Sequence, residues 1–250
     1  MISLAGRRLL VTGGSRGIGR ATALLAAQAG ADVGVLYHTR RAEADTVARA
    51  IRAMGRRAFL GGGDLADADR VAQLMSEVRA AFGGLDGLVV NHGIWPATET
   101  ALARMAPERW RRTMAADLDS VFLVTRAALG LMDTGGRVVM VASTAAQRGE
   151  AFHADYAAAK GAMVALVKSL AVECAPGITV NAVAPGWVAT EMTTTALAGD
   201  AGERAAAGIP LGRVASAEDV AGPILFLLSD LARHVTGEIL NVNGGSVLCG

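Results

Sequence analysis

The segment Arg8-Leu-Leu-Val-Thr12, followed by Gly13-Gly-Ser-Arg-Gly-Ile-Gly19 and an Ala-rich run to Ala29, decides the fold. An apolar strand, a glycine-rich turn and a helix follow one another directly. The glycines allow a tight turn, close approach of the backbone to a phosphate, and close packing of the helix on the strand. The free N–H groups and positive dipole end of the helix favour an anion at this point. The segment therefore predicts a pyrophosphate-binding turn at the start of an α/β fold.

Short apolar runs alternate with Ala- and Arg-rich segments of helical period along the rest of the chain. Nearly continuous apolar strands suit a sheet that is covered on both faces. Short connections between them imply right-handed crossovers. The sequence thus predicts an α/β protein in which residues 1–250 form a single doubly wound Rossmann-type domain, a seven-stranded parallel sheet with helices on both faces. The expected strands are Arg8–Thr12, Asp32–Tyr37, Arg57–Leu60, Gly87–Asn91, Arg137–Val141, Ile178–Ala184 and Ile239–Val242; the expected helices are Ile18–Ala29, Ala42–Met54, Asp67–Phe82, Pro107–Leu131, Asp155–Cys174 and Ser216–Ser229.

Residues 187–213 form the longest weakly patterned stretch, rich in Thr, Ala and Gly. An irregular segment of this length inside a compact domain is usually functional. We therefore expect it to be a mobile lid over a substrate site.

Composition excludes several classes of partner. The net charge of +1 gives no electrostatic reason to expect nucleic acid or a membrane surface. Cys174 and Cys249 are too few for a disulfide framework, and no neighbouring residues supply the spacing of a metal site, so we expect buried or incidental thiols and no metal. The chain reaches its first strand without room for a signal peptide and contains no apolar run long enough to span a bilayer. The expected location is the cytoplasm.

Tyr156 and Lys160 are the most informative chemical pair. Four residues are about one helical turn, so the phenol and the ammonium share a helical face. A nearby cation lowers the pKa of a phenol, and a tyrosine tuned in this way exchanges protons as a carbonyl/alcohol oxidoreductase requires. Alone, such a pair is more often an exposed one. Ser143 lies thirteen residues before Tyr156 and lacks the Gly-x-Ser-x-Gly elbow of an acyl-transfer nucleophile.

The end of the second strand bears on the choice between NAD and NADP. An NAD site usually places Asp or Glu there for the ribose 2′-hydroxyl, whereas an NADP site uses Arg. The strand Asp32–Tyr37 has its acid at the opposite end, and its continuation brings Arg40 and Arg41. Arg16 with Arg40 or Arg41 would hold a 2′-phosphate through charge-assisted hydrogen bonds. NADP is therefore favoured, and the alternative is a solvated arginine cluster beside an NAD site.

These residues together resemble the short-chain dehydrogenase/reductase family over essentially the whole chain. The matching segments are Thr12–Gly19, Asp64-Leu65, Asn91-His92-Gly93, the set Ser143, Tyr156 and Lys160, Asn181–Gly186 with Thr190, Pro210–Arg213 and Val242–Gly245. The cofactor site expected from this resemblance comprises Gly13, Ser15, Arg16, Gly17, Ile18, Gly19, Tyr37, His38, Arg40, Asp64, Leu65, Asn91, Gly93, Tyr156, Lys160, Pro185, Gly186, Val188 and Thr190.

The resemblance also assigns chemical roles. Ser143 is expected to hydrogen-bond the substrate carbonyl, Tyr156 to protonate it, and Lys160 to tune the phenol and hold the nicotinamide ribose. Two residues depart from the family pattern. Asp117 replaces an Asn that helps hold a water in a proton relay; we count it with the catalytic residues and expect it to raise the phenol pKa by like-charge repulsion. His92 replaces an Ala and is expected either to line the pocket or to be a packed residue.

The substrate site is expected to include Ser143 and Tyr156 and to be lined by Trp95, Gln147, Arg148, His153, Trp187 and the Thr190–Leu197 part of the lid. Helices 107–131 and 156–174 have more apolar surface than one sheet face needs, and the corresponding helices of relatives pair across subunits, so we expect a homotetramer or homodimer. The expected function is NADP(H)-dependent interconversion of a small-molecule carbonyl and a secondary alcohol, most similar within the family to 3-oxoacyl-[acyl-carrier-protein] reductases. The alternatives are an NAD-dependent alcohol or sugar dehydrogenase and a non-catalytic cofactor-binding regulator.

Overall fold

The computed structural model describes residues 2–248, and these form one parallel sheet of seven strands in the order β3-β2-β1-β4-β5-β6-β7. Strands are added in one direction from β1 to β3 and in the other direction from β4 onward. The connections that follow β1 and β4 therefore run to opposite faces of the sheet, and a crevice opens between the carboxyl ends of these two strands. The predicted fold class is confirmed. The strands are β1 Arg8–Thr12, β2 Asp32–Tyr37, β3 Ala58–Gly62, β4 Leu85–Val90, β5 Met132–Val141, β6 Ile178–Pro185 and β7 Ile239–Val242.

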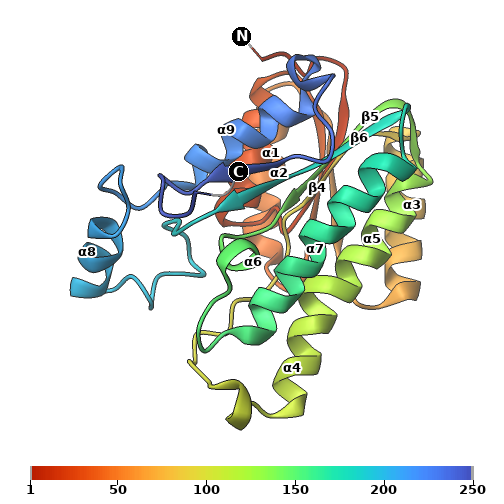
Figure 1. The fold of residues 1–250 in the computed structure, drawn as a ribbon. Coiled ribbons are helices and arrows are strands. Elements are labelled where there is room, and N and C mark those ends of the chain that lie inside the picture. Colours follow the sequence, from red (N-terminus) through yellow and green to blue (C-terminus); the bar gives the residue numbers. More distant parts are fainter. Residues whose placement is uncertain (1, 249–250) are drawn as a thin grey trace.

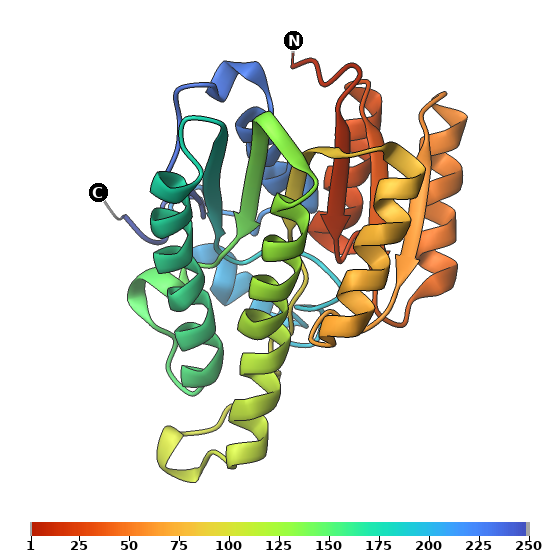
Figure 2. The same ribbon diagram turned by 90° about the vertical axis from the view of Figure 1, so that its right-hand side faces the viewer.

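Helices cover both faces of the sheet (Figures 1 and 2). One layer contains α1 (Gly17–Gln28), α2 (Arg41–Ala53) and α9 (Ala217–Leu228), and the other contains α3 (Ala68–Phe82), α5 (Ser120–Leu129) and α7 (Ala154–Glu173). Strand periodicity divides the core between these layers. Along β1, Leu9 and Val11 belong to the first apolar cluster and Leu10 to the second. The sheet is therefore buried on both faces, as its nearly continuous apolar strands indicated.

The expected helix Pro107–Leu131 is interrupted, which corrects the prediction. It consists of α4 (Pro107–Met114), a π-helical turn η2 (Ala115–Asp119) and α5. A π turn adds a residue to the helical repeat without breaking the apolar pattern, so periodicity does not reveal it. Within the turn the Asp117 side chain is buried and accepts a hydrogen bond from the Ile94 backbone N–H at 2.7 Å. The wide turn thus inserts a carboxylate between the helix and the sheet edge.

The 187–213 segment contains a helix that the sequence did not predict, α8 (Asp200–Ala207), which projects beyond the sheet in Figure 1. None of its residues is buried, so it lacks the apolar stripe that identifies a surface helix. The segment is anchored at both ends by the bridge between Val188 and Ala215. The short elements of the chain are α6 (Ala145–Arg148), η1 (Leu102–Arg104) and η3 (Asp230–Ala232).

Helix α9 begins as expected. Ser216 accepts the Asp219 N–H at 3.2 Å, and the Asp219 carboxylate accepts the Ser216 N–H at 2.7 Å, forming a capping box. Among residues 2–248, none of the helices is long and apolar enough to cross a membrane. Within the same residues no group of His, Cys, Asp and Glu side chains is arranged to hold a metal ion. Cys174 is a free, partly buried thiol, and Cys249 lies outside the described residues.

Candidate active site

A cavity of about 610 Å³ opens at the carboxyl ends of the strands, where the sheet order reverses. The glycine turn lies at one end of it, and Ser143, Tyr156 and Lys160 lie at the other. Segments distant in sequence converge here because parallel strands all end at the same edge. The predicted cofactor residues that line the cavity are Gly13, Ser15, Arg16, Gly17, Ile18, Tyr37, His38, Arg40, Asp64, Leu65, Asn91, Gly93, Tyr156, Lys160, Pro185, Gly186, Val188 and Thr190.

The glycine turn has the geometry that a bound pyrophosphate needs. Gly13 and Gly17 have φ of +62° and +51°, a region that residues with a Cβ rarely adopt. A Cβ on Gly17 would lie 3.3 Å from the Thr190 methyl group, so the turn and the 187–213 segment approach closely. No side chain caps the N-terminus of α1 at Arg16, which leaves its first N–H groups available to an anion. The turn thus fits a diphosphate group.

Gly19 was predicted to belong to the cofactor site, but it serves the helix packing that the glycine turn also predicted. It is buried and does not line the cavity. A Cβ there would overlap the Gly13 carbonyl oxygen and the Asn91 side-chain nitrogen. Asn91 Nδ2 also donates to the carbonyl oxygens of Thr12 and Gly13, at 3.3 and 3.2 Å. Gly19 therefore permits the packing of α1 on the turn, and Asn91 ties the turn to the end of β4.

The predicted arginines Arg16 and Arg40 line the cavity at the end that contains the glycine turn. Arg40 forms an exposed ion pair with Glu43 at 2.9 Å. A hydrogen bond to its own backbone N–H and one from Arg40 lower the pKa of Glu43, and the charges of Arg40 and Arg16 act in the same direction. Both guanidinium groups therefore act on one place beside the end of β2. Asp32 lies at the other end of the strand and pairs with Arg57 at 2.6 Å, as its sequence position indicated.

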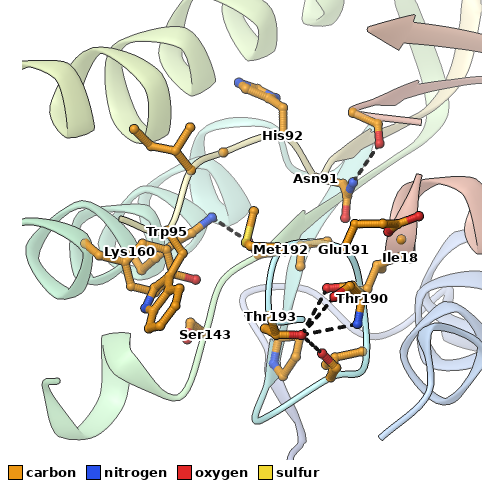
Figure 3. A pocket seen from close by; sticks show the side chains of 18 of the residues that line it. Ile18, Asn91, His92, Trp95, Ser143, Lys160, Thr190, Glu191, Met192 and Thr193 are labelled. Carbon is orange, nitrogen blue, oxygen red and sulfur yellow. Dashed lines mark hydrogen bonds between the residues drawn. The ribbon is translucent and has the colours of Figure 1, made fainter. Parts of the chain in front are cut away.

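Ser143, Tyr156 and Lys160 come together from two elements. Ser143 follows β5, whereas Tyr156 and Lys160 lie one turn apart on α7. The Ser143 side chain lies close enough to the Tyr156 hydroxyl to lower its pKa by hydrogen bonding. The buried Lys160 ammonium donates to the Val141 carbonyl oxygen at 3.0 Å and lies 5.8 Å from the Tyr156 ring centroid. Figure 3 shows Lys160 and Ser143 across the cavity from Thr190 and Thr193 of the 187–213 segment.

The expectation that Lys160 lowers the pKa of Tyr156 is wrong for this structure. Burial raises the pKa of Tyr156 well above its ordinary value, the hydrogen bond from Ser143 opposes this shift, and the charges of Asp117 and Glu150 add to it. Burial also lowers the pKa of Lys160, while Asp117 opposes that shift. The ammonium donates to the Val141 carbonyl oxygen. Desolvation of the phenol is the largest contribution to the pKa shift of Tyr156. Tyr156 is therefore held in its protonated form.

Asp117 is a buried carboxylate next to this set. Its Oδ1 accepts the Ile94 N–H, and Oδ2 has no hydrogen-bond partner among residues 2–248. Burial raises the pKa of Asp117 to about 6, and the charge of Lys160 opposes that rise. A Cβ on Gly93 would lie 3.2 Å from the carboxylate, so the backbone after β4 packs directly on it. The predicted effect of Asp117 on the phenol pKa is confirmed.

His92 is a packed residue that also borders the cavity. Its Nδ1 lies 2.7 Å from the Thr12 hydroxyl and its Nε2 lies 2.8 Å from the Ser120 hydroxyl. Because Ser120 donates its proton to the Ala116 carbonyl at 2.7 Å, it must accept from an Nε2–H. Burial lowers the pKa of His92 to about 3, so the ring is neutral and cross-links β1 to α5.

Trp95, Arg148 and Trp187 line the cavity as predicted. Of the predicted Thr190–Leu197 stretch, residues 190–193 also line it. His153 and Gln147 do not, which corrects the prediction for both. The His153 ring is only 3% exposed and stacks behind Trp95, while Gln147 donates to Asn241 at 2.6 Å. Gln147 lies within α6, and His153 directly precedes α7.

Several lining residues were missed by sequence reasoning. Glu150 reaches the cavity from the turn between Gly149 and Phe152, both of which have positive φ, and no periodic pattern marks that turn. Arg204 and Ile209 lie on or just after α8, the helix without an apolar stripe. For Arg204 and Ile209, the only sequence signal was the unusual length of the 187–213 segment.

Comparison with known proteins identifies the family. The sequence profile described as Enoyl-(Acyl carrier protein) reductase matches residues 13–246. The 3-oxoacyl-[acyl-carrier-protein] reductase of Synechocystis sp. is 41% identical over 252 residues, covering 99% of this chain and all of that protein. The 3-oxoacyl-[acyl-carrier-protein] reductase of Escherichia coli is 38% identical over 247 residues, 98% of each chain.

Solved structures agree with these sequence matches. A short-chain dehydrogenase from Burkholderia cenocepacia in complex with NADP has a TM-score of 0.92 and 36% identity, covering 97% of this chain and 98% of the other. A short-chain dehydrogenase/reductase from Brucella melitensis, described as a glucose/ribitol dehydrogenase, has a TM-score of 0.92 and 34% identity over 99% of both chains. The chain is a member of the short-chain dehydrogenase/reductase family.

Proposed function

We propose that this protein is an NADP(H)-dependent oxidoreductase that reduces a carbonyl group to a secondary alcohol, in the manner of the 3-oxoacyl reductases it resembles. One observation carries the proposal: a single cavity joins the glycine turn and the two arginines at one end to Ser143 and Tyr156 at the other. A cofactor that spans this cavity brings its reactive end to the Ser143 and Tyr156 hydroxyls. The names of the two reductase relatives and the NADP complex of the Burkholderia protein support the same assignment.

Different residues of the cavity bind different parts of the dinucleotide. The N–H groups at the start of α1 donate to the pyrophosphate oxygens, and the Arg16 and Arg40 guanidinium groups donate to a 2′-phosphate. The Asp64-Leu65 segment and Asn91 border the intervening part of the cavity. Lys160, as the family resemblance implies, holds the hydroxyls of the nicotinamide ribose. The bound nicotinamide supplies the hydride.

Tyr156 and Ser143 act on the substrate oxygen. The Ser143 hydroxyl orients the carbonyl by donating to its oxygen, and the Tyr156 hydroxyl protonates that oxygen as negative charge develops on it. The raised pKa of Tyr156 keeps the phenol protonated at neutral pH, which is the form that donates. Two preorganised donors in a largely buried site stabilise an oxyanion without a cost of reorganisation at that moment.

Asp117 maintains the charge state of Lys160. In its ionised form the carboxylate opposes the loss of the ammonium proton that burial would otherwise favour. Its unpartnered Oδ2 is an acceptor suited to a water in the proton relay. We propose that Asp117 supports the relay through this oxygen and accepts a proton where the family's asparagine cannot.

A second assignment, use of NAD, is favoured by one observation. Glu43 already forms an ion pair with Arg40, so part of the positive charge at the end of β2 is neutralised. An exposed ion pair of this kind contributes little and is readily exchanged for a doubly charged phosphate. We therefore retain NADP as the preferred cofactor.

The test is a comparison of kcat/KM for NADPH and NADH with a panel of ketones, followed as loss of nicotinamide absorbance. The proposal predicts turnover with at least one ketone and a higher kcat/KM with NADPH. Equal or better efficiency with NADH would make the enzyme NAD-dependent. Cofactor binding without turnover of any carbonyl or alcohol would support a regulatory role instead.

We also propose self-association through the helices that expose apolar side chains. Trp110 on α4, Phe122 on α5 and Val172 on α7 are 37%, 52% and 79% exposed. Light scattering that gives the mass of a single chain at micromolar concentration would exclude the dimer and the tetramer. The lid role of residues 187–213 and the cytoplasmic location stay predictions.

A further inference from the structure

Two indole rings form a right-angled corner in the wall of the cavity. The ring centroids of Trp95 and Trp187 are 6.0 Å apart and the ring planes meet at 80°. Trp95 follows β4 and Trp187 follows β6, so the corner exists only in the folded chain. Both rings line the same cavity as Ser143, and Figure 3 shows Trp95 on the Ser143 and Lys160 side of it, opposite the lid.

Contacts on its outer side hold Trp95 in place. The ring stacks on His153 with centroids 4.7 Å apart and planes inclined by 19°. The indole Nε1–H donates to Glu150 Oε1 at 3.0 Å. His153 is itself fixed, because it is 3% exposed and its Nε2 lies 2.9 Å from the Pro96 carbonyl oxygen. Trp95 therefore meets a ligand with its orientation already set, which removes the entropic cost of ordering it.

The shape and the polarity of the corner favour a flat aromatic group. An aromatic ring stacks on the face of one indole and presents its edge to another, because ring faces are negative and ring edges positive. A saturated ring of the same carbon number gains the apolar contact and lacks this electrostatic match. The Glu150 carboxylate beside the corner disfavours an anionic substituent there, and Arg148 is exposed to solvent, which screens its charge.

We propose that the corner formed by Trp95 and Trp187 binds an aromatic ring carried by the carbonyl substrate, so that the preferred substrates are aryl-substituted ketones. Glu150 is a positioning residue that acts by holding Trp95. The inference rests on the proposed carbonyl reduction and adds the substrate class to it.

The experiment compares 1-phenylpropan-2-one with 1-cyclohexylpropan-2-one as substrates. A methylene group insulates the carbonyl from the ring in both, so the two ketones differ in the flatness and π charge distribution of the ring. The measured quantity is the ratio of kcat/KM values, phenyl over cyclohexyl. Stacking of aromatic pairs corresponds to about two- to twelvefold, and the wild type should show a ratio of that size in favour of the phenyl ketone.

The variants locate the source of that ratio. Trp95→Ala and Trp187→Ala should each bring it towards one, while Trp95→Phe retains part of it and also shows that loss of folding is not the cause. Trp110→Ala is the matched control, because this tryptophan lies outside the cavity and should keep the wild-type ratio. Glu150→Ala should lower the ratio, and Glu150→Gln, which still accepts the indole N–H, should restore it.

The outcomes distinguish a failure of the aromatic-ring site from a failure of the proposed carbonyl reduction. Reduction of both ketones with the same ratio in the wild type and in Trp95→Ala overturns the aromatic-ring site and leaves carbonyl reduction standing. A wild-type ratio at or below one would also overturn the aromatic-ring site and leave carbonyl reduction standing. Reduction of neither ketone, nor of any other in the panel, overturns the proposed function and the inference with it.

Discussion

Asp117→Asn tests the electrostatic cost of burying a carboxylate inside the π turn. The substitution keeps the size of the side chain and an oxygen that accepts the Ile94 N–H, and it removes the charge. The pKa of Asp117 is about 6 in the folded chain, against an ordinary value of 3.8. An acid whose folded pKa is raised binds more protons in the folded state, so stability is lost as the pH rises from about 4 through 6.

The size of this effect follows from the two pKa values. The raised pKa of Asp117 should lower the free energy of unfolding by about 3 kcal/mol at pH 7.5 and by about 1.6 kcal/mol at pH 5. Asparagine has no such cost at either pH. The stability of Asp117→Asn relative to the wild type should therefore be about 1.4 kcal/mol more favourable at pH 7.5 than at pH 5. Ionisable groups that do not interact with Asp117 cancel from this difference because both proteins share them.

Urea unfolding at the two pH values, at one protein concentration, measures this quantity. Asp119→Asn is the matched control, because Asp119 lies in the same turn and is exposed. The control should follow the pH dependence of the wild type. A parallel pH dependence in the wild type and in Asp117→Asn would refute the electrostatic account of this residue.

Further substitutions test the other parts of the site. Lys160→Met should raise the KM for NADPH, because ribose binding depends on the ammonium; a wild-type KM for NADPH in steady-state kinetics would remove the ribose role. Combined Arg16→Ala and Arg40→Ala should lower kcat/KM for NADPH by roughly ten- to a hundredfold and leave NADH little changed, and an equal loss with both cofactors would contradict a 2′-phosphate site. Gly19→Ala should weaken cofactor binding and lower the thermal midpoint, since a Cβ there overlaps the glycine turn; calorimetry showing wild-type values for both would show that the turn accommodates it.

The parts of the site that sequence could predict are those fixed by local spacing. The glycine turn follows its strand directly, and Tyr156 and Lys160 are one helical turn apart, so their positions follow from the period of a helix and the edge of a parallel sheet. Ser143 was placed by the strand that precedes it. These relations survive any error of one or two residues in the bounds of an element.

The remainder depended on packing that no periodic pattern records. The π turn that buries Asp117 adds a residue without disturbing the apolar stripe, and α8 has no buried residue at all. His153 has a plausible sequence position for the substrate pocket, yet it supports Trp95 from behind. The pKa shift of Tyr156 was predicted from its nearest cation, whereas burial determines the direction of that shift. Burial is a property of the assembled chain, so neighbours in sequence cannot supply it.

Tyr156→Phe gives the most direct test of the central claim, that this hydroxyl protonates the substrate oxygen. The substitution removes one oxygen atom from the cavity and keeps the ring. The account predicts a kcat that falls by about 10²- to 10⁴-fold in NADPH-dependent ketone reduction, with a Kd for NADPH close to that of the wild type. A variant that retains more than about a tenth of the wild-type kcat would contradict the claim, because Tyr156 would then not be the main general acid.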